Sequence, residues 1–304
     1  MRKNIFMLFS GCLLGLSAPA LAIDIFACEP EWQALAHELA GDKAKIYVAT
    51  SAYQDPHRVQ ARPGLISAVR RADLVFCTGG GLESGWLPVL LQKGSNPQVL
   101  KAPGLLLATE QVSLLEKPQT LERSEGDIHA EGNPHIHLDP RRVLTVAEAL
   151  AQRLQEIDAA NARFYQTQLE KFRQQWHSNL AAWQQQAQPL RNSKVIVHHR
   201  SWSYLLDWLG MDSVAELEPK PGLPPTPSHL ASLTNVVRQT GTPLILYTDY
   251  NGSDAANWLA NHSEACAIRL PMTVGGMEAV DTLSALYGSL INALLTAQEQ
   301  CRHG

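Results

Sequence analysis

The segment from Asn133 to Pro140 carries the residues best suited to hold a metal ion. It reads Asn-Pro-His-Ile-His-Leu-Asp-Pro, so that His135 and His137 lie between two prolines. Proline fixes its own φ and pushes the preceding residue towards extended conformations, which restricts how the imidazoles are presented. If the segment is extended, both rings point to one side, whereas they diverge if it turns into the following helix. Asp139 predicts that helix, because Asp is a good cap and Pro suits the first turn.

Three further polar residues lie at the ends of predicted strands or at the starts of predicted helices. His57 follows a strand, His199 ends one, and Asp281 begins the last helix. Ligands of open α/β sheets gather beyond the carboxyl ends of the strands, so these side chains and His135 are expected to meet in one cleft. Three imidazoles and one carboxylate form a four-coordinate set suited to Zn²⁺, whereas manganese and magnesium want more oxygen ligands.

Neighbouring residues compete for the same roles. His198 competes with His199, because alternation along a strand turns only one of them to the cleft. Asp249 and Glu218 are rival carboxylates close to strand ends. Asp281 is a good helix cap whether or not it binds a metal. From the residues alone, the oxygen ligand therefore stays open among three carboxylates.

Strand-like and helix-like segments alternate along the chain on both sides of one long helix. Eight strands are expected, at 23–28, 45–50, 73–77, 105–108, 194–199, 213–218, 244–249 and 266–270. This alternation predicts an α/β fold in which each of two lobes is a mostly parallel sheet flanked by helices. Residues 159–187 keep helical spacing, and a helix of that length spans roughly 42 Å. We expect it to be a rigid linker between an N-terminal lobe (23–158) and a C-terminal lobe (188–304).

Residues 1–22 have the pattern of a cleaved secretory signal peptide. Arg2 and Lys3 precede an apolar run, which ends in the small-residue tripeptide Ala20-Leu21-Ala22. The residues before Cys12 form a poor lipobox, which argues against lipid attachment. No later stretch is apolar for long enough to span a bilayer. With 25 Lys and Arg against 29 Asp and Glu, the chain carries a formal charge of −4, which disfavours nucleic acid and anionic lipid as partners.

Four of the five cysteines lie after the predicted signal peptide. An oxidising compartment favours pairing, and none of the four forms a C-x-x-C motif. Cys266 and Cys301 both belong to the second lobe, close to its last strand and last helix, so we predict a disulfide between them. Cys28 and Cys77 end strands that should be neighbours, and a bridge there is one alternative, with free buried thiols as the other.

The motifs taken together resemble those of the metal-binding receptors of bacterial ABC transporters, in particular the family that takes up zinc and manganese. His135 in Asn-Pro-His-x-x-Leu-Asp-Pro resembles the central motif of that family, and Asp55-Pro56-His57 its first ligand loop. His199, followed by an aromatic-rich segment, resembles its third ligand segment, and Asp281-Thr282-Leu283 falls where the family has its carboxylate. Residues 158–162 resemble the start of its interlobe helix, so the match covers essentially the whole mature chain.

The resemblance implies metal ligation by His57, His135, His199 and Asp281, in a monomeric periplasmic receptor that catalyses nothing. It implies delivery of the ion to an ABC permease in the inner membrane, and histidine at 199 favours Zn²⁺ over manganese. Many zinc receptors of this kind carry a long histidine-rich loop before the central motif. Here that loop is short and acidic with only His129, which we treat as a candidate auxiliary ligand.

Three other functions are compatible with the same residues. A manganese or iron receptor would use the same fold. A secreted zinc hydrolase would hold zinc by three histidines and leave a fourth position open for water, although the chain has no H-E-x-x-H motif. A periplasmic zinc buffer or surface adhesin would bind the ion without a transporter partner.

Overall fold

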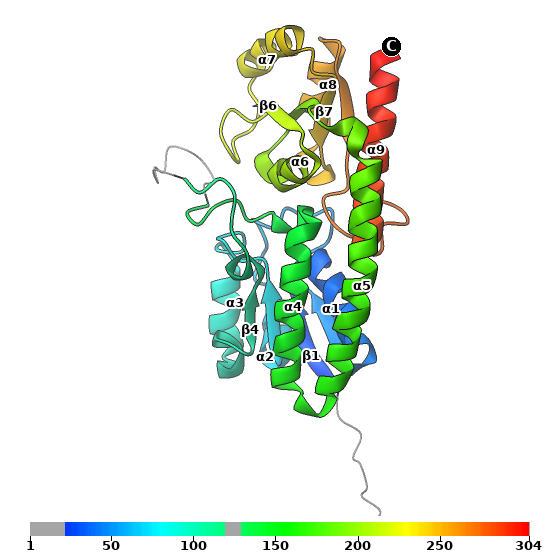
Figure 1. Ribbon diagram of the computed structural model, residues 1–304. Coiled ribbons are helices and arrows are strands. Elements are labelled where there is room, and N and C mark those ends of the chain that lie inside the picture. Colours follow the sequence, from blue (N-terminus) through cyan, green and yellow to red (C-terminus); the bar gives the residue numbers. More distant parts are fainter. Residues whose placement is uncertain (1–21, 119–128, 304) are drawn as a thin grey trace, which may run out of the picture.

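The structure, a computed structural model, describes residues 22–118 and 129–303; all but one residue of the predicted signal peptide lies outside these ranges. Two α/β lobes lie one above the other, with a long helix running beside both (Figure 1). The predicted fold class is confirmed. Within the described ranges, no helix is both long enough and apolar enough to span a membrane.

The N-terminal lobe is built on a four-stranded parallel sheet with the order β2-β1-β3-β4. Its strands are β1 (Ile23–Ala27), β2 (Ala44–Val48), β3 (Leu74–Cys77) and β4 (Leu105–Leu107). Helices α1 (Pro30–Ala40) and α4 (Pro140–Ile157) cover the face that carries Ile25 and Phe76. Helices α2 (Pro63–Arg71) and α3 (Leu87–Gly94) cover the opposite face, which carries Phe26 and Val75. Both faces are covered, which explains why these strands are almost continuously apolar.

The C-terminal lobe repeats the arrangement, with the strand order β6-β5-β7-β8, again all parallel. Its strands are β5 (Lys194–Val197), β6 (Asp212–Glu216), β7 (Leu244–Tyr247) and β8 (Cys266–Arg269). Helices α7 (Pro227–Thr240) and α8 (Asp254–Asn261) cover one face, and α6 (Ser203–Leu209) and α9 (Leu283–His303) cover the other. The segment after the carboxyl end of β5 carries His199, which lies close to His57 and His135 of the N-terminal lobe, so the strand ends of the C-terminal lobe face the interface.

The linker helix α5 (Ala162–Gln186) belongs to the core of both lobes. Its Trp176 and Trp183 are buried, and Trp176 Nε1 donates a hydrogen bond of 2.8 Å to the carbonyl of Pro140 at the start of α4. The same apolar cluster continues from α1 and α4 through α5 to Tyr287 of α9. One continuous core therefore holds the two lobes against each other.

Of the helix starts predicted above, the start of the last helix at Asp281 is wrong. Thr226 caps α7, because Pro227 occupies the first helical position and the cap must precede it. Asp158 makes no capping bond; its carboxylate accepts hydrogen bonds from the side chains of Tyr165 and Asn161 instead. The last helix begins two residues after Asp281, and the Thr282 hydroxyl accepts the bond from its first turn. The predicted cap of α4 by Asp139 is confirmed, since its carboxylate accepts from the Arg141 amide.

Candidate metal centre

Three histidines from both lobes bring their ring nitrogens together at the lobe interface. His57 lies in the loop that follows β2, His135 immediately precedes a 3₁₀ turn (Ile136–Leu138), and His199 follows β5. One ligand nitrogen from each ring lies within 4.8 Å of the other two. Two of these residues come from the N-terminal lobe and one from the C-terminal lobe, so the group exists only while the lobes are packed together.

Local backbone conformation decides which histidine of each pair takes part. His199 is extended (φ −134°, ψ 159°) and belongs to the histidine group, whereas His198 is buried outside that group, with its Nε2 4.0 Å from the Glu218 carboxylate. After His135 the chain turns into the 3₁₀ helix, and the rings of His135 and His137 diverge, with centroids 6.3 Å apart and planes at 70°. Of the two conformations open for this segment, the structure has the turned one.

Two carboxylates orient the imidazoles. Asp55 Oδ1 accepts from His57 Nδ1 at 2.7 Å, and Glu218 Oε2 accepts from His199 Nδ1 at 2.7 Å. A metal-binding histidine commonly donates its other ring N–H to such a partner, which fixes the tautomer and the ring orientation. Burial opposes ionisation of Asp55, but the hydrogen bonds and charge of His57 outweigh it and lower the pKa of this carboxyl. Both rings thus keep Nε2 available for an ion.

The imidazole of His135 is the most deeply buried of the three. Its residue is 2% exposed, and its Nε2 has no hydrogen-bond partner among the residues that the structure describes. Burial, and then the neighbouring imidazoles of His57 and His199, lower its pKa well below the ordinary value of a histidine. The ring is therefore neutral and offers a lone pair without a partner, which fits a metal ligand better than a structural hydrogen bond.

His129, at the edge of the described chain, lies beside the histidine group and contacts one of its members. Its Nε2 lies 3.2 Å from His57 Nε2, within hydrogen-bonding distance. Metal–nitrogen bonds of 2.0–2.1 Å in a tetrahedral zinc site would put two ligand nitrogens about 3.3 Å apart. The ring centroid of His129 lies 5.2 Å from that of His57 and 6.4 Å from that of His135, and His129 is not among the three residues whose ligand nitrogens all lie within 4.8 Å of one another. It is therefore a candidate for an additional ligand next to the group of three.

The structure does not bring the predicted carboxylate Asp281 to this group. Because α9 begins after Thr282, Asp281 stays in an exposed segment outside the histidine group. Of the two alternative carboxylate ligands, Asp249 forms an ion pair with Arg269, with contacts of 2.5 and 2.7 Å. Glu218 accepts the hydrogen bond from His199 Nδ1, on the side of the ring away from Nε2. Sequence reasoning missed the orienting roles of Asp55 and Glu218. The Asp-Pro-His spacing, which places a carboxylate two residues before its imidazole, was a signal for the first of them.

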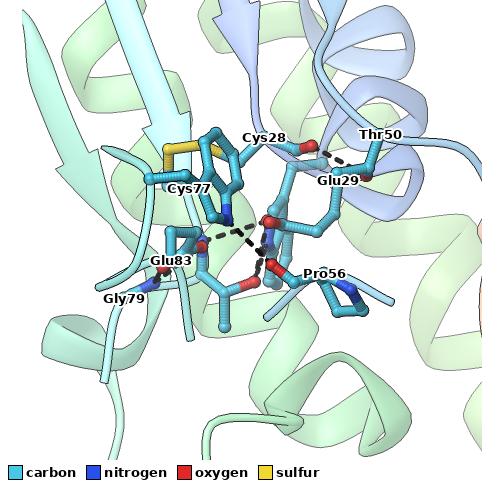
Figure 2. The surroundings of a disulfide bond; sticks show 10 residues. Cys28, Glu29, Thr50, Pro56, Cys77, Gly79 and Glu83 are labelled. Carbon is cyan, nitrogen blue, oxygen red and sulfur yellow. Dashed lines mark hydrogen bonds between the residues drawn. A yellow bond between two sulfur atoms is a disulfide. The ribbon is translucent and has the colours of Figure 1, made fainter. Parts of the chain in front are cut away.

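A disulfide and a buried pair of acids lie close together at the carboxyl ends of β1 and β3 (Figure 2). The Cys28–Cys77 bridge joins the ends of β1 and β3, and beside it Glu29 and Glu83 are each 2% exposed. Glu83 accepts hydrogen bonds from the amides of Thr78 and Gly79, and Glu29 accepts from the Thr78 hydroxyl. Burial raises the pKa of Glu83 to about 7, and burial together with the charge of Glu83 raises that of Glu29 well above its ordinary value. Because the pKa of each carboxyl group is raised, the pair holds a shared proton up to about neutral pH.

The segment that carries this acid pair also supports two of the histidines. Trp86 Nε1 donates to the carbonyl of Pro56, next to His57, at 2.8 Å. Gly81 has φ +87°, and a Cβ there would lie 3.4 Å from Nδ1 of His129. A side chain at residue 81 would therefore be strained and would also crowd that ring. The second bridge, Cys266–Cys301, joins β8 and α9, and both disulfides that the sequence suggested are present.

Two α/β lobes joined by one long helix, with histidines from both lobes converging between them, form a candidate metal-binding site between two domains. The family model described as zinc-uptake complex component A, periplasmic, matches residues 25–300, so the chain belongs to this family. Members of the family are metal-binding transport receptors.

Relatives within this group are named for different metals. The chain is 24% identical to the manganese-binding lipoprotein MntA of Halalkalibacterium halodurans over 210 residues, which are 68% of this chain and 64% of the relative. It is 23% identical to the zinc-binding lipoprotein AdcA of Streptococcus pneumoniae over 235 residues, 74% of this chain and 45% of that one. The matched segment thus spans less than two thirds of either relative.

Among solved structures, the fold resembles a crystal structure of ZnuA with a TM-score of 0.75 at 23% identity, covering 92% of this chain and 98% of that one. A ZnuA deletion mutant with zinc bound gives a TM-score of 0.74, also at 23% identity, with 92% and 97% covered. At this level of identity the likeness establishes the fold. The metal must be argued from the residues of this chain.

Proposed function

We propose that this protein is a periplasmic receptor that binds one Zn²⁺ with high affinity and delivers it to an ABC permease of the inner membrane. The observation that supports zinc is the convergence of three imidazoles, from His57, His135 and His199, with His129 beside His57 and with no carboxylate in the group among the described residues. Nitrogen ligands in a four-coordinate arrangement suit zinc, whereas manganese favours oxygen ligands and higher coordination.

The four imidazoles would be the ligands, and the two carboxylates would hold two of the rings in place. His57, His135 and His199 supply three nitrogens, and His129 replaces Asp281 as the fourth ligand. Export would follow from the predicted signal peptide at residues 1–22, and the mature protein would act as a monomer. A filled fourth position also argues against the hydrolase alternative, since no site remains at which the ion could activate a water.

The test is calorimetric titration of the metal-stripped mature protein with Zn²⁺ and Mn²⁺ in parallel. We expect one zinc per chain at nanomolar affinity or tighter, and manganese binding about 100-fold weaker or more. Equal affinities for the two ions would contradict the zinc assignment, and weak binding at several sites would contradict a single receptor site.

Two matched variants separate the candidate fourth ligands. His129→Ala should weaken zinc binding by roughly 10- to 100-fold, the range seen when one supporting group of a metal site is lost. Asp281→Ala should leave the affinity within about twofold, because Asp281 is exposed and outside the group. With Co²⁺ as the probe, the Asp281 variant should keep the intense absorption of a four-coordinate site. The reverse pattern would restore Asp281 as the ligand.

Delivery is tested by adding the permease in lipid vesicles to the zinc-loaded receptor. The proposal predicts faster zinc loss in the presence of the permease than with empty vesicles. An unchanged rate would support a zinc buffer or adhesin without a transporter partner.

A further inference from the structure

The second histidine of the Asn133–Pro140 segment, His137, lies outside the histidine group. Its side chain is 3% exposed, and of its two ring nitrogens only Nε2 is hydrogen-bonded among the residues that the structure describes. Nε2 donates to the carbonyl of Met272 at 3.0 Å, and Nδ1 lies 3.1 Å from Oε1 of Glu31. Its own carbonyl accepts a hydrogen bond from the hydroxyl of Tyr287. His137 belongs to the N-terminal lobe, whereas Met272 and Tyr287 belong to the C-terminal lobe.

Glu31 contacts both His137 and a residue of the C-terminal lobe, Thr273. It lies in the first turn of α1 and is 2% exposed. Its Oε2 accepts a hydrogen bond of 2.5 Å from the hydroxyl of Thr273, which follows Met272 in the C-terminal lobe. Glu31, His137 and Thr273 thus form a buried, directional connection between the lobes, which we call the interlobe latch.

The latch is buried, with aromatic side chains on one side of it and a small cavity next to His135 on the other. Trp32 packs edge-on against the ring of His137, with centroids 6.5 Å apart at 82°, and Tyr287 is fully buried. Buried polar sets of this kind contribute little net stability, because desolvation offsets their attraction. They differ from apolar contacts in requiring one geometry. The latch therefore specifies how the lobes are placed rather than how strongly they adhere.

The latch and the metal centre share structural elements on both sides of the interface. His135 and His137 lie two residues apart around one 3₁₀ turn, and both line a cavity of about 20 Å³ together with Glu31 and Thr273. On the other side, Met272 and Thr273 follow β8, and His199 follows β5, in the same sheet. A shift of the C-terminal lobe against the latch therefore changes the separation of His135 and His199, whose ring centroids are 6.0 Å apart.

We infer that Glu31, His137 and Thr273 are positioning residues that hold His199 at ligand distance from His57 and His135 and so slow the escape of the metal. The inference rests on the proposed function in taking the bound ion as zinc. Metal–ligand distances tolerate deviations of only about 0.2 Å. If the interface between the lobes is loosened, the bond between the metal and His199 is therefore expected to break before the bonds to the histidines of the N-terminal lobe.

The test measures zinc dissociation from the loaded protein into excess chelator by stopped flow. Thr273→Val keeps the shape of the side chain and removes the hydroxyl that donates to Glu31, and we expect dissociation about tenfold faster. Thr273→Ser keeps the hydroxyl and should restore a rate within about threefold of the wild type. Glu31→Gln is a second, independent variant that should also accelerate the loss, and it carries the test if Thr273→Val fails to fold.

The matched control is Ser284→Ala, which removes a hydrogen bond of 3.0 Å that Asn179 of α5 donates across to α9, away from the histidines. It should leave the dissociation rate unchanged. The Co²⁺-loaded Thr273→Val protein should also show altered absorption bands, a signature that a loss of stability alone would not produce. A wild-type rate in Thr273→Val, or equal acceleration by Ser284→Ala, overturns the inference.

Failure of the proposed function can be told apart from failure of the latch. Amide hydrogen exchange on the metal-free proteins reports the latch without zinc. Exchange in residues 270–276 should be faster in Thr273→Val than in the wild type and unchanged in Ser284→Ala. If the wild type binds no zinc, the zinc proposal fails and this exchange experiment decides the latch: equal exchange in all three proteins refutes it.

Discussion

Replacing Glu83 by glutamine should make the free energy of unfolding less dependent on pH. In the wild type, protonated Glu83 should stabilise the fold in acid, and this stabilisation should be lost towards neutral pH. Burial raises the pKa of Glu83 from 4.5 to about 7, so the folded chain binds this proton more tightly than the unfolded chain. Stability falls with pH wherever the folded state binds more protons. The contribution is therefore fully present below pH 4.5 and is lost as the pH rises towards 7. Glutamine stays neutral over the whole range.

The magnitude follows from the two pKa values. A shift from 4.5 to about 7, at 1.36 kcal/mol per unit, corresponds to about 3 kcal/mol. Glu83 is 2% exposed, so solvent screening does not reduce this figure much. Glutamine keeps an oxygen for the amides of Thr78 and Gly79, and its NH₂ group can donate to Glu29 in place of the shared proton. The substitution thus isolates the titration from the packing.

Urea unfolding of the metal-free wild type and Glu83→Gln, at several pH values from 4.5 to 7.5, measures the effect. The free energy of unfolding of the wild type minus that of the variant should fall by about 3 kcal/mol over this range. Glu299→Gln, which removes one carboxylate from an exposed position, controls for the general change in charge. A flat difference curve for Glu83→Gln, or the same slope in both variants, would refute the shared-proton interpretation.

Three further expectations address the supports of the metal centre and of the lobes. Glu218→Ala should lower zinc affinity by roughly 10- to 100-fold in a chelator competition, because His199 loses the partner of its Nδ1, and an unchanged affinity would deny that role. The double change Cys266→Ser and Cys301→Ser removes a disulfide between residues 35 apart in the sequence, so it should lower the free energy of unfolding in urea by about 4 kcal/mol. A decrease of less than about 1 kcal/mol would contradict this expectation. Trp176→Phe removes the indole N–H that donates to the carbonyl of Pro140, so it should lower the free energy of unfolding by about 1–3 kcal/mol in thermal unfolding and leave zinc affinity unchanged. Weaker zinc binding would mean that α5 also positions the metal site.

The fold and three members of the histidine group follow from local patterns. Strand and helix alternate, the carboxyl ends of parallel strands meet at one edge, and His57 and His199 each follow a strand. Asp281 illustrates the limit of such patterns. Whether the last helix starts at Asp281 or two residues later depends on which side chain caps it, and Thr282 makes the bond. A shift of this size decides whether a carboxylate can reach a site.

Other features depend on contacts between residues far apart in the sequence. The engagement of His137 depends on Met272, which lies 135 residues further along the chain. The position of His129 is seen only from its contact with His57, 72 residues earlier. The Cys28–Cys77 bridge requires β1 and β3 to be neighbours, which was expected, but whether the two thiols pair or stay free depends on geometry that spacing along the chain does not give.

A receptor with this construction can release its ion by a small displacement rather than by wide opening. Wide opening would expose the core that joins the lobes, including Trp176, Trp183 and Tyr287, all of which are at most 7% exposed. The loss of such large side chains from a core is costly, typically 3–5 kcal/mol for one removed tryptophan. A shift of a few tenths of an ångström at His199, by contrast, already exceeds the tolerance of a metal–nitrogen bond. We therefore expect a partner that delivers or removes the ion to act on the latch, where little movement is needed, and to leave the core of the two lobes intact.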